Sequence, residues 1–194
     1  MPDSTPFSQE NDDMVIKPWK RISLEVALDE KWFPVTKHTV ELPSGTVLND
    51  YFVWSSPDIA VVVPITSDGK FVVCQQYRFA VDKIMYQFPA GAINKNEEPE
   101  AAAWREMEEE SGYTGGEMTY LGKVTPFGPK MTGWHHMFLA QNVVMGGQKD
   151  DDENEPTKIY LMTATELQQL IEDGEFESGD CLTAALLVFR KLGL

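Results

Sequence analysis

The residues in this chain best suited to chemistry lie in the stretch Gly91 to Tyr113, with the sequence GAINKNEEPEAAAWREMEEESGY. Glu106, Glu109 and Glu110 fall on a segment predicted as a short loop followed by a helix, and residues three and four positions apart share a helix face. Like charges this close repel, so the carboxylates indicate a cation between them. Because hard divalent ions such as Mg2+ or Mn2+ take oxygen ligands, the stretch predicts a metal site.

A glutamate-rich helix can also be no more than a solvated surface helix. The preceding Gly91, the outlying Glu97 and Arg105 beside the glutamates argue against that interpretation. We predict that Gly91 allows an unusual backbone conformation ahead of the helix, since glycine tolerates conformations that other residues avoid. We also predict that Arg105 forms a bidentate pair with a carboxylate and orients it, as partners of metal ligands do.

The spacing resembles the signature box of the Nudix hydrolases at every specified position, namely Gly91, Glu97, Arg105, Glu106, Met107, Glu109, Glu110, Gly112 and Tyr113. A chance match at one start position is on the order of 1 in 10^8 for ordinary residue frequencies. The resemblance implies that Glu106, Glu109 and Glu110 bind Mg2+ (or Mn2+) and that the backbone carbonyl of Ala90 adds a ligand. It also implies that Glu97 and Arg105 brace the loop within the catalytic site.

Two segments upstream resemble the ADP-ribose pyrophosphatase branch of that family, which includes hydrolases of other nucleoside-diphosphate sugars. These are Gln76-Tyr77-Arg78 and Phe88-Pro89-Ala90-Gly91. The resemblance implies that Arg78 binds the diphosphate or the terminal ribose, whereas the simpler alternative is a strand-end arginine in a solvated ion pair. The chain departs from the pattern at Gln87, where a glutamate is frequent, so contacts to substrate or to Arg78 are expected to differ there.

A second acidic cluster runs from Asp150 to Glu155. Such a run is usually a solvated loop. Its place after a predicted strand resembles the Asp-Glu-x-Glu loop of the ADP-ribose pyrophosphatases, and this implies that Glu153 deprotonates the attacking water. Glu155 is the alternative base or a further metal ligand, and Glu109 also stays open as the base.

Aromatic and basic residues supply candidates for the rest of the substrate. Trp19 is the candidate for stacking on a nucleobase because it precedes the first predicted strand among basic residues, although core packing is the default for a tryptophan. The loop from Gly128 to His136 is expected to border the sugar, with Lys130, Trp134 and His135 as candidates. The two histidines at its end are not predicted to bind the metal, because hard ions prefer oxygen.

The strands and helices that must position these residues are also indicated by the sequence. Together they predict an α/β (α+β) layered fold of the Nudix type. Residues 1–15 are expected to form a disordered tail, 16–57 an antiparallel β region for base binding and dimerisation, and 58–194 the hydrolase domain. In the last, apolar runs predict strands at 59–65, 70–76, 85–88, 118–124, 137–144 and 157–162. Strands with helices interspersed favour a mixed sheet between helices.

Three helices have clear sequence signals. Pro99 suits the first turn of the helix that carries the glutamates, and Gly112 suits its C-cap. Thr163 and Glu166 have capping-box spacing and open a helix to about Asp173. Apolar residues from Ala184 to Leu192 predict a C-terminal helix.

The formal net charge of −15, from 31 Asp and Glu against 16 Lys and Arg, argues against nucleic acid or an anionic membrane as partner. The N-terminus has no secretory pattern, and no apolar run approaches the ~20 residues that span a bilayer. With only Cys74 and Cys181, a disulfide framework is not expected, which fits a cytoplasmic protein.

The leading hypothesis is therefore metal-dependent hydrolysis of ADP-ribose or another nucleoside-diphosphate sugar. The alternatives are a Nudix hydrolase of a different nucleotide diphosphate, or a catalytically silent Nudix domain that binds a nucleotide and regulates a partner. Members of this branch are commonly homodimers in which the N-terminal β region reaches over the partner, so the resemblance implies a homodimer.

Overall fold

The computed structural model describes residues 15–147, 149 and 156–194. Contacts divide the chain into two compact units, one that ends at Trp54 and one from Ser55 to Leu194. This division falls three residues before the boundary predicted between residues 57 and 58. The predicted disordered tail lies outside the described residues, apart from Val15.

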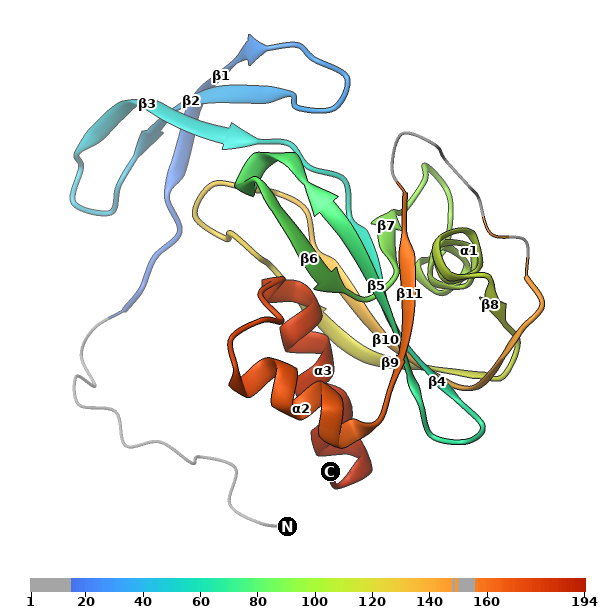
Figure 1. The fold of residues 1–194 in the computed structure, drawn as a ribbon. Helices are drawn as coiled ribbons and strands as arrows, with labels where there is room; N and C mark the ends of the chain where they lie inside the picture. The colour runs from blue at the N-terminus through green and yellow to red at the C-terminus, as the bar shows by residue number, and fades with distance from the viewer. Residues whose placement is uncertain (1–14, 148, 150–155) are drawn as a thin grey trace. The chain divides into compact units, whose positions relative to one another are not determined.

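The first unit contains a three-stranded antiparallel sheet in the order β1-β2-β3 (Figure 1). Its strands are β1 (Lys20–Leu28), β2 (Val35–Glu41) and β3 (Val47–Trp54). A turn at Pro43-Ser44-Gly45 joins the last two, and Gly45 has a φ of 85° that favours glycine. Val40 is the sole buried hydrophobic residue among the described residues of this unit, so its sheet has almost no core of its own.

The second unit is built on an eight-stranded mixed sheet, in which β11-β5-β4-β10-β8 form the main path. The strands are β4 (Ile59–Thr66), β5 (Phe71–Arg78), β6 (Lys83–Gln87), β7 (Ala90–Ala92), β8 (Tyr113–Thr114), β9 (Glu117–Val124), β10 (His135–Met145) and β11 (Lys158–Met162). β4 and β10 are parallel, whereas β5 pairs antiparallel with β6 and β11, and β10 with β9. A 3-10 turn, η1 (Phe79–Val81), joins β5 to β6.

The three helices cover both faces of this sheet, with α1 (Pro99–Ser111) on one face and α2 (Ala164–Glu172) and α3 (Gly179–Leu192) on the other (Figure 1). The end signals predicted from sequence are confirmed. Pro99 lies in the first turn of α1, and Gly112 closes it with a φ of 72°. Thr163 and Glu166 form the reciprocal capping box at the start of α2.

The core of this unit consists of two apolar layers separated by β4. Val61, Val63 and Ile65 pack in the layer under α2 and α3. Ala60 and Val62 alternate with them and pack in the layer under α1. Since alternate residues of a strand point to opposite faces, one continuous apolar strand serves both layers. Full burial of each valine side chain contributes about 1.5–3 kcal/mol.

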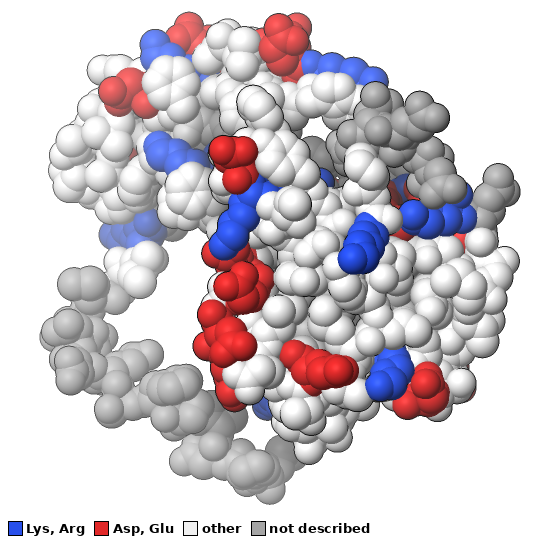
Figure 2. Space-filling model, in the orientation of Figure 1, with Lys and Arg blue, Asp and Glu red and all other residues white. Residues whose placement is uncertain are grey.

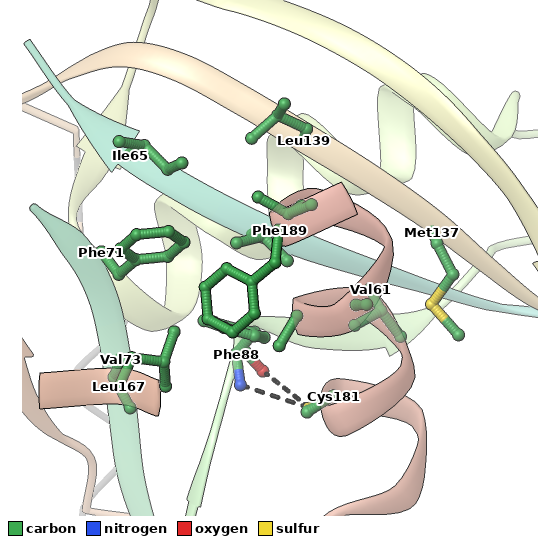
Figure 3. Packing of buried hydrophobic residues seen from close by; sticks show 14 of the residues in the cluster. Val61, Ile65, Phe71, Val73, Phe88, Met137, Leu139, Leu167, Cys181 and Phe189 are labelled. Carbon is green, nitrogen blue, oxygen red and sulfur yellow. Dashed lines mark hydrogen bonds between the residues drawn. The ribbon is translucent and has the colours of Figure 1, made fainter. Parts of the chain in front are cut away.

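In the layer under α3, aromatic rings and a thiol join the helix to the sheet (Figure 3). The Phe71 and Phe189 ring centroids are 5.8 Å apart in an edge-to-face arrangement. The backbone N–H of Phe88 donates to Cys181 Sγ at 3.3 Å. This contact holds the segment that leads to Ala90 and Gly91. Helix α3 therefore helps to position the candidate site from the face of the sheet opposite α1.

Two features differ from the sequence prediction. The short strand Ala90–Ala92 (β7), which pairs with β4, was not predicted. β8 was also not predicted. Both strands are too short for a periodic pattern, and pairing with distant strands stabilises them.

The acidic composition is visible on the surface. Figure 2 shows acidic side chains in a column over the segment between α2 and α3, where Glu172, Asp173, Glu175 and Glu177 are exposed. In the described part of the chain, no helix is long and apolar enough to cross a membrane.

Candidate active site

Helix α1 presents the glutamates because its opposite side is anchored in the core. Ala102, Ala103 and Met107 have no exposed surface and pack under the sheet. Glu106 lies next to this buried stripe and is only 9% exposed, whereas Glu109 and Glu110 are half-buried. These three carboxylates of α1 therefore differ in burial, with Glu106 the most buried of them.

Arg105 connects these carboxylates to the loop that precedes the helix. Its Nε and Nη2 donate to the two oxygens of Glu97, both at 2.9 Å, which is the bidentate pair expected from sequence. Its Nη1 donates to Glu106 and, at 3.1 Å, to Glu109. Nη2 also donates to the carbonyl oxygen of Ala92 at 2.9 Å. One guanidinium therefore holds three carboxylates and the end of β7 together.

Two of the three carboxylates that contact Arg105, those of Glu97 and Glu106, have pKa values shifted in opposite directions. Hydrogen bonds from Arg105, and then from the backbone N–H of Asn94, lower the pKa of Glu97 to about 2. Burial raises the pKa of Glu106, and the hydrogen bond from Arg105 offsets this only in part. A nearby positive charge stabilises the ionised form of a buried carboxylate. A metal ion bound at Glu106 would supply such a charge.

Gly91 acts differently from the sequence prediction. Its φ is not among the positive values found at other glycines, so the expected unusual backbone conformation is wrong. A Cβ at this position would instead lie 2.2 Å from the Cδ atom of Glu106. The Glu106 carboxylate packs directly against the backbone of β7, so any side chain at position 91 would displace this carboxylate.

Glu110 contacts Ala90, the first residue of β7. The backbone N–H of Ala90 donates to Glu110 Oε2 at 3.1 Å. Burial raises the pKa of the Cys74 thiol well above its usual range, with Glu110 raising it further and Lys149 and Arg78 lowering it. These charged groups therefore all act on one point of β5, beneath the carboxylate end of α1.

Arg78 lies at the end of β5 and is half-buried. Its Nε donates to Gln87 Oε1 at 3.0 Å, so the residue that departs from the family pattern braces Arg78 through a neutral amide. Gln87 is three positions before Ala90, which contacts Glu110. The chain thus links Arg78 to the carboxylate site through one short segment.

The loop candidates lie beside β4 and β10. The backbone N–H of Trp134 donates to Asp58 at 2.9 Å, and Lys123 Nζ lies 4.6 Å from the centroid of the Trp134 ring. Lys130 is half-buried, and its backbone N–H donates to Phe127. His135 Nδ1 donates to Asp180 Oδ2 at 3.0 Å, which gives His135 a role in joining β10 to α3. None of these contacts brings the loop candidates to the carboxylates.

For the remaining candidates, Trp19, Glu153 and Glu155, no contact with the carboxylates of α1 is described. Trp19 belongs to the first unit, where it is 48% exposed and makes an edge contact with Tyr51 at 5.5 Å between centroids. Half of its surface is therefore accessible for stacking. Glu153 and Glu155 lie outside the described residues.

The donor set fits a hard divalent ion by its chemistry. It consists of carboxylate oxygens with a backbone carbonyl nearby, and the Gly91 backbone leaves space for the buried Glu106 carboxylate. Within the described ranges, no three acidic, histidine or cysteine side chains are arranged closely enough to hold an ion. The reason is visible in the contacts, because Glu106 and Glu109 turn to Arg105 while Glu110 turns to Ala90.

Comparison with known families agrees with this geometry. Residues 56–183 match the NUDIX domain, and residues 19–54 match the nucleoside diphosphate sugar hydrolase N-terminal domain. The chain therefore belongs to the Nudix hydrolases. The N-terminal match is to a domain described for nucleoside diphosphate sugar hydrolases, and it spans the three strands of the first unit.

Individual relatives show how far the similarity extends. The ADP-ribose pyrophosphatase of Bacillus subtilis is 32% identical over 177 residues, covering 89% of this chain and 92% of the relative. The CMP-5'-(N-acetyl-N-hydroxy-3-aminopropyl)phosphonate hydrolase of Streptomyces rubellomurinus is 27% identical, covering 80% and 75% of the two chains. A crystal structure of an ADP compounds hydrolase shares the fold with a TM-score of 0.82 at 21% identity, covering 93% of this chain and 97% of that one.

Around Arg78, sequence reasoning pointed to Gln76 and Gln87 but missed Thr157, Lys149 and the hydrogen bonds that connect them. Gln76 and Gln87 are both buried and lie in a hydrogen-bonded row with Thr157, while Lys149 donates to the Thr157 carbonyl at 3.1 Å. One signal was available, because Gln76 and Arg78 are two positions apart on a strand and so face the same side. Their pairing with Thr157, 81 positions away, could come only from the fold.

Proposed function

We propose that this protein hydrolyses the diphosphate linkage of ADP-ribose or related nucleoside-diphosphate sugars with Mg2+ or Mn2+. The observation that carries the proposal is the buried Glu106 carboxylate, packed against Gly91 and grouped with Glu97 and Glu109 around Arg105. The similarity to the Bacillus subtilis ADP-ribose pyrophosphatase supports the choice of ADP-ribose. The products are a nucleoside monophosphate and a sugar phosphate.

In this proposal Glu106, Glu109, Glu110 and the carbonyl of Ala90 would hold the metal, which would supply positive charge to the diphosphate and lower the pKa of a bound water. Arg105 keeps Glu106 and Glu109 oriented through its pair with Glu97. Arg78 binds a diphosphate oxygen, because guanidinium matches phosphate geometry. The diphosphate and the carboxylates are both negatively charged. In this proposal the metal and Arg78 supply the positive charge that lets the diphosphate bind beside the carboxylates.

The reaction itself is an attack by water on one phosphorus. The water oxygen forms a new bond to phosphorus, the bond to the bridging oxygen breaks, and a carboxylate removes the proton from the water. We assign that base to Glu153, with Glu155 and Glu109 as the alternatives. Glu153 and Glu155 lie outside the described residues, so this part of the proposal depends on the sequence resemblance.

The two ends of the substrate are assigned to side chains with accessible surface. We assign Trp19 to the nucleobase, since it is 48% exposed. Lys130 and Trp134 are assigned to the sugar, and Trp134 is 40% exposed. The buried, unpaired Cys74 and Cys181 thiols support a reducing compartment such as the cytoplasm.

We further propose that the protein is a homodimer formed through its N-terminal sheet. Ile22, Leu24 and Val26 on β1 are 51%, 49% and 64% exposed in the single chain. Exposed apolar surface of this kind on a sheet favours association, and a second copy provides a symmetric partner. Twice the 21.9 kDa mass of the chain is the expected particle.

A substrate panel tests the function. ADP-ribose, GDP-mannose, UDP-glucose, NADH and nucleoside triphosphates are incubated with the protein and Mg2+ or Mn2+, and phosphate is measured after a coupled phosphatase. We expect the highest kcat/KM for a nucleoside-diphosphate sugar. Preference for NADH or a triphosphate would favour a different Nudix substrate, and activity on none of them would favour a silent nucleotide-binding domain.

A further inference from the structure

A row of hydrogen-bonded side chains crosses three neighbouring segments of the sheet at Arg78. Arg78 Nε donates to Gln87 Oε1 at 3.0 Å, and Gln87 Nε2 donates to Gln76 Oε1 at 2.6 Å. Gln76 Nε2 then donates to the hydroxyl of Thr157, just before β11. Gln87 and Gln76 are 5% and 6% exposed. We call these four residues the glutamine row.

The direction of every bond in the glutamine row follows from Arg78. A guanidinium can only donate, so Gln87 must turn its oxygen to Arg78 and its amide nitrogen to Gln76. Gln76 must then accept through its oxygen and donate to Thr157. Bonds aligned in this way strengthen one another, and each buried amide is satisfied on both sides. The row is therefore a directional support for one arginine.

The row is anchored at its far end as well. The carbonyl oxygen of Thr157 accepts a hydrogen bond from Lys149 Nζ at 3.1 Å. Cys74 lies on the same face of β5 as Gln76, and its thiol is under the electrostatic influence of both Arg78 and Glu110. The glutamine row therefore lies on the same face of the sheet as Cys74, and Lys149 holds its far end.

The row supports Arg78 without neutralising it. Among the residues that the structure describes, Arg78 takes part in no ion pair, and its hydrogen-bond acceptor is a neutral amide. A glutamate at position 87 would fit the same space and accept the same bond, but it would cancel the arginine charge and add a negative charge near Glu110. The amide avoids both effects.

We propose that Gln87 is a positioning residue that orients Arg78 for an anionic diphosphate while it leaves the full charge of Arg78 for the ligand. This rests on the proposed function, since that function assigns Arg78 to the substrate. Gln87 itself touches no substrate in this proposal. Its effect must therefore depend on Arg78, and it must be an effect on binding of the diphosphate more than on turnover.

The test measures binding of α,β-methylene-ADP, a diphosphate that cannot be hydrolysed at the bridging position, to the full chain by titration calorimetry with Mg2+. We expect Gln87→Glu to raise Kd about tenfold, because the glutamate would pair with Arg78 and withdraw the arginine charge from the ligand. Gln75→Glu is the matched control. Gln75 adds the same charge to the same strand but faces the other side, where its Oε1 accepts from Tyr160 at 3.2 Å. We expect less than a twofold change there.

A double-mutant cycle separates positioning from general damage to the sheet. In an Arg78→Gln background, Gln87→Glu is expected to change Kd by less than twofold, because the group through which it acts is gone. Gln87→Met, which removes the acceptor without adding charge, is expected to raise Kd by roughly threefold and gives a second variant if the glutamate disturbs folding. Circular dichroism melting confirms that each variant is folded.

Unchanged binding by both Gln87 variants would overturn the proposal, and so would an equal effect of Gln87→Glu with and without Arg78. A wild-type chain that does not bind the probe would also overturn it. Hydrolysis of ADP-ribose, measured on the same preparations, reports on the proposed function separately. The expected binding pattern without hydrolysis leaves the positioning role standing and removes the enzymatic function, whereas hydrolysis without the pattern does the reverse.

Discussion

The two sheets of this protein bury their residues to opposite extents. In the second unit, Val61, Val62 and Val63 of β4 have no exposed surface, because helices cover both faces of the sheet. In the first unit, every residue of β1 is exposed. A sheet with helices on both faces can hold carboxylates in fixed positions, whereas a thin sheet with apolar residues in solvent needs another surface. We infer that the second unit carries the chemistry and that the first serves assembly and base binding.

The sharpest way to test this division is to remove one carboxylate. Glu106→Gln keeps the shape of the side chain but removes its charge, so kcat on ADP-ribose is expected to fall about a thousandfold. The matched control is Glu108→Gln on the same helix, where the carboxylate accepts from Thr114 at 3.2 Å and faces away from Arg105. Steady-state kinetics of both variants decide the point, and equal activity of the two would remove Glu106 from the site.

A methyl group at position 91 tests whether the close approach of β7 positions the Glu106 carboxylate. The Cβ of Gly91→Ala would lie 2.2 Å from the Glu106 Cδ atom, so the carboxylate must move and kcat/KM is expected to fall about a hundredfold. Gly179→Ala is the control, because a Cβ there meets nothing within 4 Å. Wild-type activity in Gly91→Ala would show that the close approach does not matter for catalysis.

A charge on β1 tests the role of the thin sheet. Leu24→Lys places an ammonium on the exposed apolar face, and we expect the dimer Kd to rise roughly thirtyfold, about 2 kcal/mol. Ser23→Lys on the opposite face of the same strand is the control. Sedimentation velocity over a concentration series measures both. A wild-type particle of 21.9 kDa would contradict the dimer.

The smallest expected effect concerns the attachment of α3. Burial tends to raise the pKa of Asp180, but hydrogen bonds from His135, Ser178 and the Cys181 backbone outweigh it and lower that pKa below its usual value near 3.8. A carboxyl group with a lowered folded-state pKa stabilises the protein above its unfolded pKa, and this contribution is lost as the pH falls through the lower folded value. Asp180→Asn should therefore cost about 1 kcal/mol at pH 7.

Urea unfolding at several pH values measures this cost. The difference between wild type and Asp180→Asn should be constant above pH ~5 and shrink as the pH falls below ~4, where the wild-type carboxyl group starts to lose its advantage. A difference that grew toward low pH would have the wrong sign for a lowered pKa. An unchanged free energy of unfolding at pH 7 would show that the charge of the Asp180 carboxylate contributes nothing to stability through its contacts with His135, Ser178 and Cys181.

The sequence predicted what local chemistry determines. Pro99, Gly112 and the Thr163 capping box act within one or two turns, so the ends of α1 and the start of α2 were predictable. The sequence predicted that Arg105 pairs with a carboxylate and that Arg105 and Glu97 brace the loop, and the structure shows that these two residues pair with each other. What depended on distant pairing was missed, including β7 on β4 and the contact of Gln76 with Thr157. The role of Gly91 was misjudged because its cause is a side chain 15 positions later.

The central claim is metal-dependent cleavage of a nucleotide-sugar diphosphate by this chain. The most direct measurement is chromatography of the products formed from ADP-ribose by the purified full chain, with Mg2+ and with excess EDTA. We predict AMP and ribose 5-phosphate in equal amounts with Mg2+, and none with EDTA. No AMP with Mg2+ or Mn2+, or AMP release that EDTA does not change, would contradict the account.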